Sequence, residues 1–594
     1  MWLFLLTPIF ALFASCPVED FLSQSLLFQA DELTKKYHFE IAKLSRPIET
    51  PQAKKALQQA SIWFSIDLET LQNPSFLSLS SEPFWELLRE IGVEGVRLQN
   101  VKAGGKYRTS LGLDAKWGQG WEELMAILQK KGIILIIDSI GEATGLSADF
   151  FLALKNWGDY PSLYHLIEIE KADWKLLPEV PPCQLATNIP WLELQRLHKK
   201  GYVPEDFSPY EKRSQWNVTP PTKGADGQVR RWIYLKSRAL DPVIDWLNPS
   251  FAGCRIGAAD TLESIYNLGA GIIQWNELSG MNAGKTLALW TRKLGAFSAM
   301  DVTGGLYAMK EAPADLIHDR LTRQALMHAL LTEDAEALRL MYRLMLKEDM
   351  EAKRLIHSLQ PFQEFGCEWT EFTAQPQKRV PYYEETLTQE ALKFRLLKED
   401  IESLKGNNVP TWPSLCVQSS QGGDFLEAQK IHLLLSFFYA MQPGVFSFSA
   451  SDLMGALTQE PLDLFSGNKA SLYGSLESQM RNSCSFASRL RHMFSIRNDF
   501  GIAFGRLAAI PHTAHLNLLA LVYQLDGGRT ELLTINFSKQ KIHETFEIPS
   551  IRQTYAIDLM TGLGEQKPVS SPNITVTLPP LSGKVILFQP KYYD

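Results

Sequence analysis

The stretch that decides the fold class is WEELMAILQKKGIILIID, residues 121–138. Residues 121–131 have the pattern of a helix, which the glycine at position 132 is expected to end. Residues 133–137 are then continuously apolar, up to Asp138. A continuous apolar strand that follows a helix indicates a parallel sheet covered by helices on both faces.

The same alternation of strands and helices continues on both sides of this stretch. Residues 61–66 are predicted to form a buried strand, residues 84–92 a helix closed by a glycine, and residues 93–98 the next strand. Enough such units follow for an eight-fold barrel or for a large open α/β sheet. After about residue 500 the pattern changes to short alternating segments, which is typical of a small all-β domain.

The composition is that of an ordinary globular protein, since 45% of the 594 residues are hydrophobic and 21% are charged. It excludes disorder or a collagen-like repeat as the main state. There are 59 Lys and Arg residues against 66 Asp and Glu residues, which gives a net charge of −7. That balance leaves no broad electrostatic footprint for nucleic acid, so no nucleic-acid partner is predicted.

The sequence carries no motif for a metal or nucleotide cofactor. Its six cysteines are scattered, with no Cys-x-x-Cys pair and no Cys/His cluster, so no zinc site is predicted. There is also no glycine-rich dinucleotide loop, no phosphate-binding loop and no nucleophile elbow. We therefore predict no cofactor.

The first 16 residues, MWLFLLTPIFALFASC, are apolar and too short for a comfortable membrane span. They resemble a secretory signal, and residues 12–16 also resemble a bacterial lipobox in which Cys16 would be lipidated. No Lys or Arg precedes Cys16, so a buried N-terminal helix is the alternative. We expect an exported protein, periplasmic or membrane-anchored only through this N-terminal signal or lipid, and a cytoplasmic one if residues 1–16 are not a signal.

Four parts of the chain carry a resemblance to a known family. They are FWELLREIGVEGVRLQN (84–100), WEELMAILQKKGIILIIDSIGEATG (121–145), LLLSFFYAMQPGVFSFSASDLMG (433–455) and the strand-like strings within 532–588. In their order and spacing these strings resemble the alpha-amylase superfamily, glycoside hydrolase family 13, and most nearly its trehalose synthase branch.

The resemblance implies an α/β fold with a TIM-type (β/α)8 barrel over residues 59–498 and an insertion around residues 360–410. A C-terminal all-β sandwich is expected over residues 499–594. Residues 17–58 are then a helical N-terminal arm that follows the signal or lipoprotein signal of residues 1–16.

The resemblance also implies a retaining glycoside chemistry, which needs two carboxylates about 5 Å apart. Family members add a third carboxylate, an arginine beside the nucleophile and two histidines on the sugar. In the first conserved region the family's Asp is present as Asp138, while Glu142 and Ala143 stand at its Asn and His. Asp138 is a candidate sugar contact, with capping of the following loop as the equal alternative.

The nucleophile region follows a Leu-Gly pair in the family, and here Leu268-Gly269 leads to Gln274-Trp275-Asn276. Gln274 falls on the arginine and Asn276 on the nucleophile. A neutral amide cannot supply an anionic nucleophile, and it no longer needs a cation beside it. Trp275 and Asn276 are predicted substrate contacts, with a place in the core as the alternative for Trp275.

The other two carboxylate positions are also occupied by residues of another type. Residues 306–311 are predicted to form the general-acid strand, which places Met309 at the acid and Glu311 two residues beyond it. Residues 415–420 are the candidate strand for the third carboxylate, which places Ser419 at the family's His and Ser420 at its Asp.

Three hypotheses follow. The first is a catalytically disabled alpha-amylase-like protein that acts as a carbohydrate-binding or scaffold module, with an alpha-glucan or alpha-glucoside, or a protein, as its partner. The second is an active hydrolase or transglycosidase whose carboxylates are relocated to Asp138, Glu277, Glu311 or Asp424. The third is a purely structural partner domain that binds no sugar.

Overall fold

The computed structural model describes residues 18–37, 51–104, 108–141, 143–182, 184–203, 215–236, 240–246, 248, 250, 252–276, 281–302, 305–359, 425–456, 463, 471–564 and 568–590. The chain divides into two compact units. The first comprises residues 1–49, 100–118 and 137–298, and the second comprises residues 50–99, 119–136 and 299–594.

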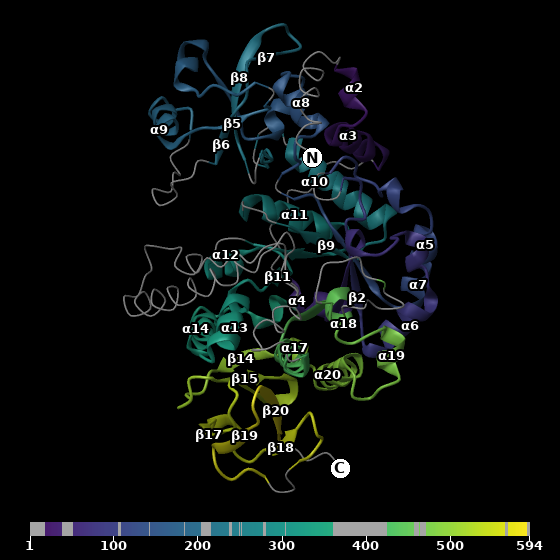
Figure 1. Cartoon of the computed structure of the whole chain (residues 1–594), viewed down its shortest axis with the longest axis vertical. Helices are drawn as coiled ribbons and strands as arrows, with labels where there is room; N and C mark the ends of the chain where they lie inside the picture. Colours follow the sequence, from purple (N-terminus) through teal and green to yellow (C-terminus); the bar gives the residue numbers. More distant parts are fainter. Residues whose placement is uncertain are drawn as a thin grey trace. The chain divides into compact units, whose positions relative to one another are not determined.

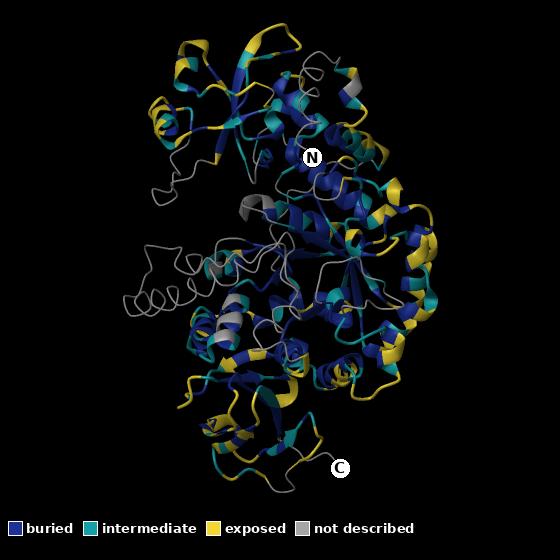
Figure 2. Ribbon diagram, viewed as in Figure 1, coloured by how far each residue is buried: buried dark blue, intermediate teal, exposed yellow. Residues whose placement is uncertain are grey.

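Eight parallel strands close into a barrel, which confirms the predicted (β/α)8 fold (Figure 1). Closure comes from pairing of the first strand with the last, in which Ile62 lies opposite Phe446. The strands are largely buried, as the dark blue in Figure 2 shows. In chain order the strands are β1 (Ile62–Asp67), β2 (Gly95–Gln99), β3 (Ile134–Asp138), β9 (Ile272–Trp275), β10 (Phe297–Met300), β11 (Leu316–His318), β12 (Leu355–Ser358) and β13 (Val445–Ser449).

The helices between these strands end where the sequence predicts. Gly92 closes α6 (Glu82–Ile91) and Gly132 closes α7 (Trp121–Lys131), each in the left-handed conformation that glycine adopts freely. No helix in the described ranges is both long and apolar enough to cross a membrane. The longer helices that follow are α10 (Ala252–Leu262), α11 (Met281–Lys293), α13 (Leu321–Thr332), α14 (Glu336–Lys347), α17 (Phe425–Ala440) and α20 (Phe486–Phe500).

An insertion that the sequence did not predict lies between β3 and α10. It contains an antiparallel sheet of order β4-β8-β6-β5, with β7 paired to β8. Its apolar core includes Ile189, Leu197, Val218 and Ile233, all fully buried. The predicted insertion around residues 360–410 lies outside the described residues. The elements of the new insertion are α8 (Ala148–Leu154), β4 (Leu166–Ile169), β5 (Thr187–Asn188), α9 (Trp191–Lys199), β6 (Trp216–Val218), β7 (Thr222–Lys223) and β8 (Val229–Leu235).

The C-terminal part is all-β, as predicted. Five antiparallel strands form a sheet of order β14-β15-β16-β20-β18, and β17 pairs with β19 in a second sheet. Gly583 lies against the ring of Phe437 in α17, where a Cβ would collide, so glycine is required there. The strands are β14 (Arg506–Ala509), β15 (Leu518–Gln524), β16 (Thr530–Asn536), β17 (Ile542–Glu547), β18 (Tyr555–Asp558), β19 (Asn573–Leu578) and β20 (Ser582–Gln589).

The N-terminal arm contains two helices, α2 (Glu19–Leu22) and α3 (Leu26–Lys36). Ser25 caps α3 by accepting a hydrogen bond from the amide of Phe28. The buried carboxylate of Asp149 accepts hydrogen bonds from the amides of Leu26 and Leu27, at 2.9 and 3.0 Å, and from Ser25 Oγ at 2.9 Å. A carboxylate at a helix N-terminus is favoured by the helix dipole, so Asp149 holds the arm in place.

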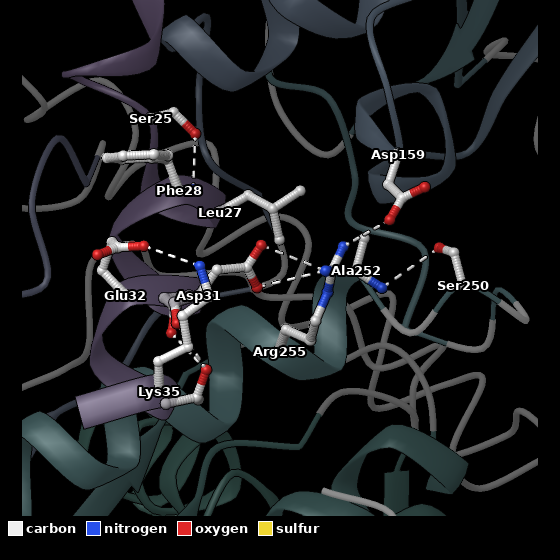
Figure 3. A network of polar contacts seen from close by, with 12 residues as sticks. Ser25, Leu27, Phe28, Asp31, Glu32, Lys35, Asp159, Ser250, Ala252 and Arg255 are labelled. Atoms are coloured by element: carbon white, nitrogen blue, oxygen red, sulfur yellow. Dashed lines mark hydrogen bonds and ion pairs between the residues drawn. The ribbon is translucent and has the colours of Figure 1, made fainter. Parts of the chain in front are cut away.

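A second contact of the arm involves an arginine on α10. Arg255 pairs with Asp31 of α3 at 3.3 Å and with Asp159 at 3.0 Å (Figure 3). These side chains are partly exposed, so the ion pairs contribute less than the buried Asp149 contact. The domain boundaries after residues 16, 58 and 498 stay predictions.

Candidate functional site

The first unit brings together three of the residues that the sequence singled out. Asp138 is the last residue of β3, and Asn276 directly follows β9. The side-chain amide of Asn276 donates a hydrogen bond to Asp138 Oδ2 at 3.2 Å. Gln274 Nε2 in turn donates to Asn276 Oδ1 at 3.2 Å. We call Asp138, Gln274 and Asn276 the strand-end cluster.

The backbone beside this cluster is fixed from several directions. The amide of Ser139 donates to the carbonyl of Gln274 at 2.8 Å, which joins the ends of β3 and β9. Arg108 Nη2 donates to the carbonyl of Asp138 at 2.6 Å. Asp260 on α10 accepts hydrogen bonds from Ser139 Oγ at 2.5 Å and from the amide of residue 140 at 2.9 Å. The position of Asp138 is therefore set by buried neighbours.

Asp260 is itself held by a buried lysine. Lys102 Nζ lies 2.6 Å from Asp260 Oδ1 and 2.7 Å from Ser264 Oγ, and both charged side chains are fully buried. Burial would raise the pKa of Asp260, but the charges of Lys102 and Arg108 outweigh it and lower that pKa. Burial lowers the pKa of Lys102, and the carboxylate of Asp260 opposes this shift. This pair could not be recognised from the sequence, because its two residues are 158 positions apart.

Trp275 lies in the core rather than in the strand-end cluster. Its side chain is fully buried, and its indole nitrogen lies 3.4 Å from Thr291 Oγ1 on α11. Successive side chains of a strand point to opposite faces, so Trp275 points away from Gln274 and Asn276. The structure thus corrects the predicted substrate contact of Trp275 to a packing role.

The predicted general-acid strand is a helix in the structure. Residues 306–311 lie in helix α12 (Gly305–Glu311), where Met309 is fully buried and Glu311 is exposed. A six-residue run is too short to distinguish the strand period from the helix period. The strand that follows β9 in the barrel is β10, and the residue directly after it is Asp301. Met309 therefore does not stand at the end of a barrel strand.

Asp301 belongs to a charged cluster in the second unit. It makes a two-point ion pair with Arg320, with both N–O distances at 2.5 Å, and is 4% exposed. Burial would raise the pKa of Asp301, but the bond to Arg320 and the charges of Arg320, His318 and Arg323 lower it. Burial lowers the pKa of His318 to about 3, reinforced by nearby arginines and opposed by Asp301. At neutral pH the carboxylate is ionised and the imidazole is neutral.

Residues 415–420, the strand predicted for the third carboxylate, lie outside the described residues. In the closed barrel, β12 lies between β11 and β13. On β12, His357 Nδ1 lies 2.9 Å from Asp319 Oδ2, and its Nε2 lies 3.1 Å from the carbonyl of Pro443. Asp319 also caps α13 by accepting hydrogen bonds from two backbone amides. These contacts give Asp319 and His357 structural roles.

The remaining predicted site residues lie outside the described residues. They are Cys16, Glu142, Glu277, Ser419, Ser420 and Asp424. Among the residues that are described, no group of three or more His, Cys, Asp or Glu side chains could hold a metal ion.

Comparison with known proteins gives a match at the level of structure alone. No family model matches the sequence, and no curated protein matches it. Solved structures do match, at low identity. An alpha-amylase from H. orenii has a TM-score of 0.56 at 12% identity, over 89% of this chain and 99% of its own. The trehalulose synthase MutB gives 0.56 at 12% identity, over the same shares. A trehalose-6-phosphate hydrolase from Bacillus licheniformis gives 0.57 at 11% identity, over 91% of this chain and 100% of its own.

Each of these matches spans almost the whole of the other chain. At this level of identity the likeness concerns the fold and leaves the chemistry to be argued from the residues. The chain has the fold of the alpha-amylases and of the trehalulose and trehalose-6-phosphate enzymes of glycoside hydrolase family 13.

Proposed function

We propose that this protein is a catalytically disabled relative of these enzymes that binds an alpha-glucan or alpha-glucoside without hydrolysing it. The observation that carries the proposal is the hydrogen bond from Asn276 to Asp138. Asn276 stands where the resemblance requires the nucleophilic carboxylate. Its amide carries no charge and donates a hydrogen bond to the neighbouring carboxylate, so it cannot act as the anionic nucleophile that attacks a glycosidic carbon.

The residue at the end of β10 supports the same proposal. A general acid must hold a proton near neutral pH, which requires a raised pKa. Asp301 is instead paired at two points with Arg320, and its pKa is lowered. It therefore has no proton to give to a leaving group at neutral pH.

The strand-end cluster retains groups suited to hydroxyls. The carboxylate oxygens of Asp138 accept hydrogen bonds, and the amide of Asn276 both donates and accepts them. Gln274 is fully buried and orients Asn276. The buried pair of Lys102 and Asp260 fixes the loop that directly follows Asp138. A preorganised set of uncharged and anionic acceptors fits a neutral, hydroxyl-rich ligand, and the names of the similar structures point to alpha-linked sugars.

The test is calorimetric titration of the purified protein with maltose, trehalose and maltooligosaccharides, together with an assay for release of glucose. We expect binding without turnover, and weaker binding for Asp138→Asn and Asn276→Ala. Turnover that Asp301→Asn or Glu311→Gln abolishes would show an active enzyme with relocated carboxylates. Absence of binding to any of these sugars would favour a structural partner domain.

We also propose that residues 1–16 direct export, with Cys16 as a lipidation site. The support is the apolar run and the lipobox-like residues 12–16. Mass spectrometry of the mature protein tests this, since cleavage before Cys16 with an added diacylglyceryl mass is expected. An unprocessed N-terminus would overturn it.

A further inference from the structure

A pair of stacked tyrosines lies on the surface of the first unit, where α3 packs against α10. The rings of Tyr37 and Tyr266 have centroids 5.7 Å apart and planes inclined by 25°. Tyr266 is 57% exposed. Tyr37 is partly buried, so Tyr266 is the outer ring of the stack. An aromatic ring that is exposed to water adds little stability to a fold and offers a face on which a ligand can stack.

The backbone that presents Tyr266 is unusual. Residues Glu263–Asn267 form a single π-helical turn that continues α10. Such turns are rare in proteins and frequent at functional sites, because one extra residue in the turn changes the direction of the side chains that follow. Here the turn brings the exposed Tyr266 and Asn267 beside Tyr37 of the N-terminal arm.

Polar groups line one edge of the stacked rings. Tyr37 donates a hydrogen bond from its hydroxyl to Asn267 Oδ1 at 2.6 Å. Asn267 Nδ2 donates to Glu263 Oε2 at 2.5 Å. Among the described residues, these bonds use one oxygen of Glu263 and one amide hydrogen of Asn267. The edge therefore still offers a carboxylate acceptor and an amide donor, which is the pairing that sugar hydroxyls require.

Charges of both signs lie near the rings, so the surface favours neither a cation nor an anion. Lys36 Nζ lies 5.4 Å from the centroid of the Tyr37 ring, where it would repel a cationic ligand. The carboxylate of Glu263 at the polar edge would repel an anionic one. A neutral ligand with an apolar face and hydroxyl edges satisfies both conditions, and a pyranose ring has this form.

We propose that Tyr37, Tyr266, Asn267 and Glu263 form a surface platform that binds a glucose unit of an alpha-glucan, separate from the strand-end cluster. A pyranose stacks its C–H face on the exposed ring of Tyr266 while its hydroxyls bond to Asn267 and Glu263. The choice of an alpha-glucan rests on the proposed function, whereas the location rests on the contacts of these four residues. A second point of attachment would raise the apparent affinity for long glucans over short ones.

The experiment is calorimetric titration of the full chain with maltoheptaose. Variants Tyr266→Ala, Tyr266→Phe, Phe28→Ala and Asn276→Ala are compared with the unchanged protein. We expect Tyr266→Ala to weaken the platform's binding about tenfold, which corresponds to the loss of one good stacking contact. Tyr266→Phe keeps the ring and should keep the binding. Phe28→Ala removes another exposed aromatic ring, 45% exposed on α3, and is the matched control for surface hydrophobicity.

The outcomes separate this proposal from the proposed function. Binding that Tyr266→Ala weakens and Phe28→Ala leaves intact supports the platform, and additional weakening by Asn276→Ala supports the proposed function as well. Binding that Asn276→Ala removes and Tyr266→Ala leaves intact overturns the platform and keeps the proposed function. Equal weakening by Phe28→Ala, or no binding of maltoheptaose at all, also overturns the platform, and titration with maltose then tests the strand-end cluster on its own.

Discussion

Asn276 and Asp138 share a hydrogen bond of 3.2 Å in which the amide is the donor and the carboxylate the acceptor. The geometry depends on one of the two side chains being uncharged. A carboxylate in place of Asn276 would put two negative charges at this distance, and one of them would have to take up a proton. The neutral residue is thus a condition for the stability of the present arrangement.

Replacement of Asn276 by Asp should therefore destabilise the protein at high pH and spare it at low pH. We expect Asn276→Asp to lower the free energy of unfolding by about 1–2 kcal/mol at pH 8. The loss should be much smaller at pH 4.5, where one carboxyl of the pair is protonated. Urea unfolding at both pH values measures this. Asn276→Ala, which removes the bond without adding a charge, should show the same cost at both. An equal loss for the two variants at pH 8 would refute the argument.

The buried pair of Lys102 and Asp260 should be costly to break. Asp260→Asn leaves the charge of Lys102 buried without its partner. We expect the free energy of unfolding to fall by about 3 kcal/mol. Affinity for maltose should fall as well, because Asp260 holds the loop beside Asp138. The surface pair of Lys130 and Glu82 is the matched control, and Glu82→Gln should change stability little. Similar losses in both variants would contradict the role of burial.

Glu531 makes stability depend on pH in the opposite sense to most carboxylates. It is fully buried on β16, and burial raises its pKa to about 8 from an ordinary value of 4.5, against the charge of Arg497. The folded protein therefore binds a proton that the unfolded chain has released. The contribution of this carboxyl to the free energy of unfolding is fully present below pH 4.5. It falls as pH rises toward 8, by up to about 1.4 kcal/mol per pH unit. Glu531→Gln should abolish this slope between pH 6 and 8.

The free energy of unfolding of Glu531→Gln and of the unchanged protein is measured by urea unfolding at several pH values. A matched control is Glu544→Gln, which changes a more accessible glutamate on β17, in the second sheet, that accepts hydrogen bonds from Thr513 and Ala514. This control should leave the slope between pH 6 and 8 unchanged. The same slope in Glu531→Gln as in the unchanged protein would show that the buried carboxyl does not titrate there.

The N-terminal arm should detach when its buried anchor is altered. Asp149→Asn puts an amide among three hydrogen-bond donors, so at least one of them loses its acceptor, at a cost of about 1–3 kcal/mol. Hydrogen exchange of residues 26–36 and limited proteolysis should both become faster. Asp159→Asn, which removes only the exposed partner of Arg255, should leave them nearly unchanged. Unchanged exchange in Asp149→Asn would assign the anchoring to the apolar contacts alone.

The parts of the fold that could be predicted from sequence are the ones with long, regular patterns. The apolar run before Asp138 and the glycines at 92 and 132 mark strand and helix ends without ambiguity. The inserted sheet between β3 and α10 was missed because several of its strands are only two to four residues long. Strands of that length carry too little alternation to be recognised.

The same limit divides the candidate site. β9 could be recognised from the Leu-Gly pair before it, and the structure places Gln274 in this strand and Asn276 directly after it, joined by a hydrogen bond. Their assignment to the family's arginine and nucleophile stays a prediction. Asp301 and Asp319 follow strands of four and three residues, and neither strand could be recognised. The positions of Asp301 and Asp319 at strand ends could therefore not be predicted from the sequence.

Closure of the barrel has a consequence for synthesis of the chain. Ile62 pairs with Phe446, so the first strand waits for its neighbour while about 380 further residues are made. At ribosomal rates of about 5–20 residues per second, that interval is about 20–80 seconds. Throughout it, the open edge of β1 can pair with any other extended chain. A binding factor that covers this edge during translation would therefore raise the yield of folded protein more than one that acts after release.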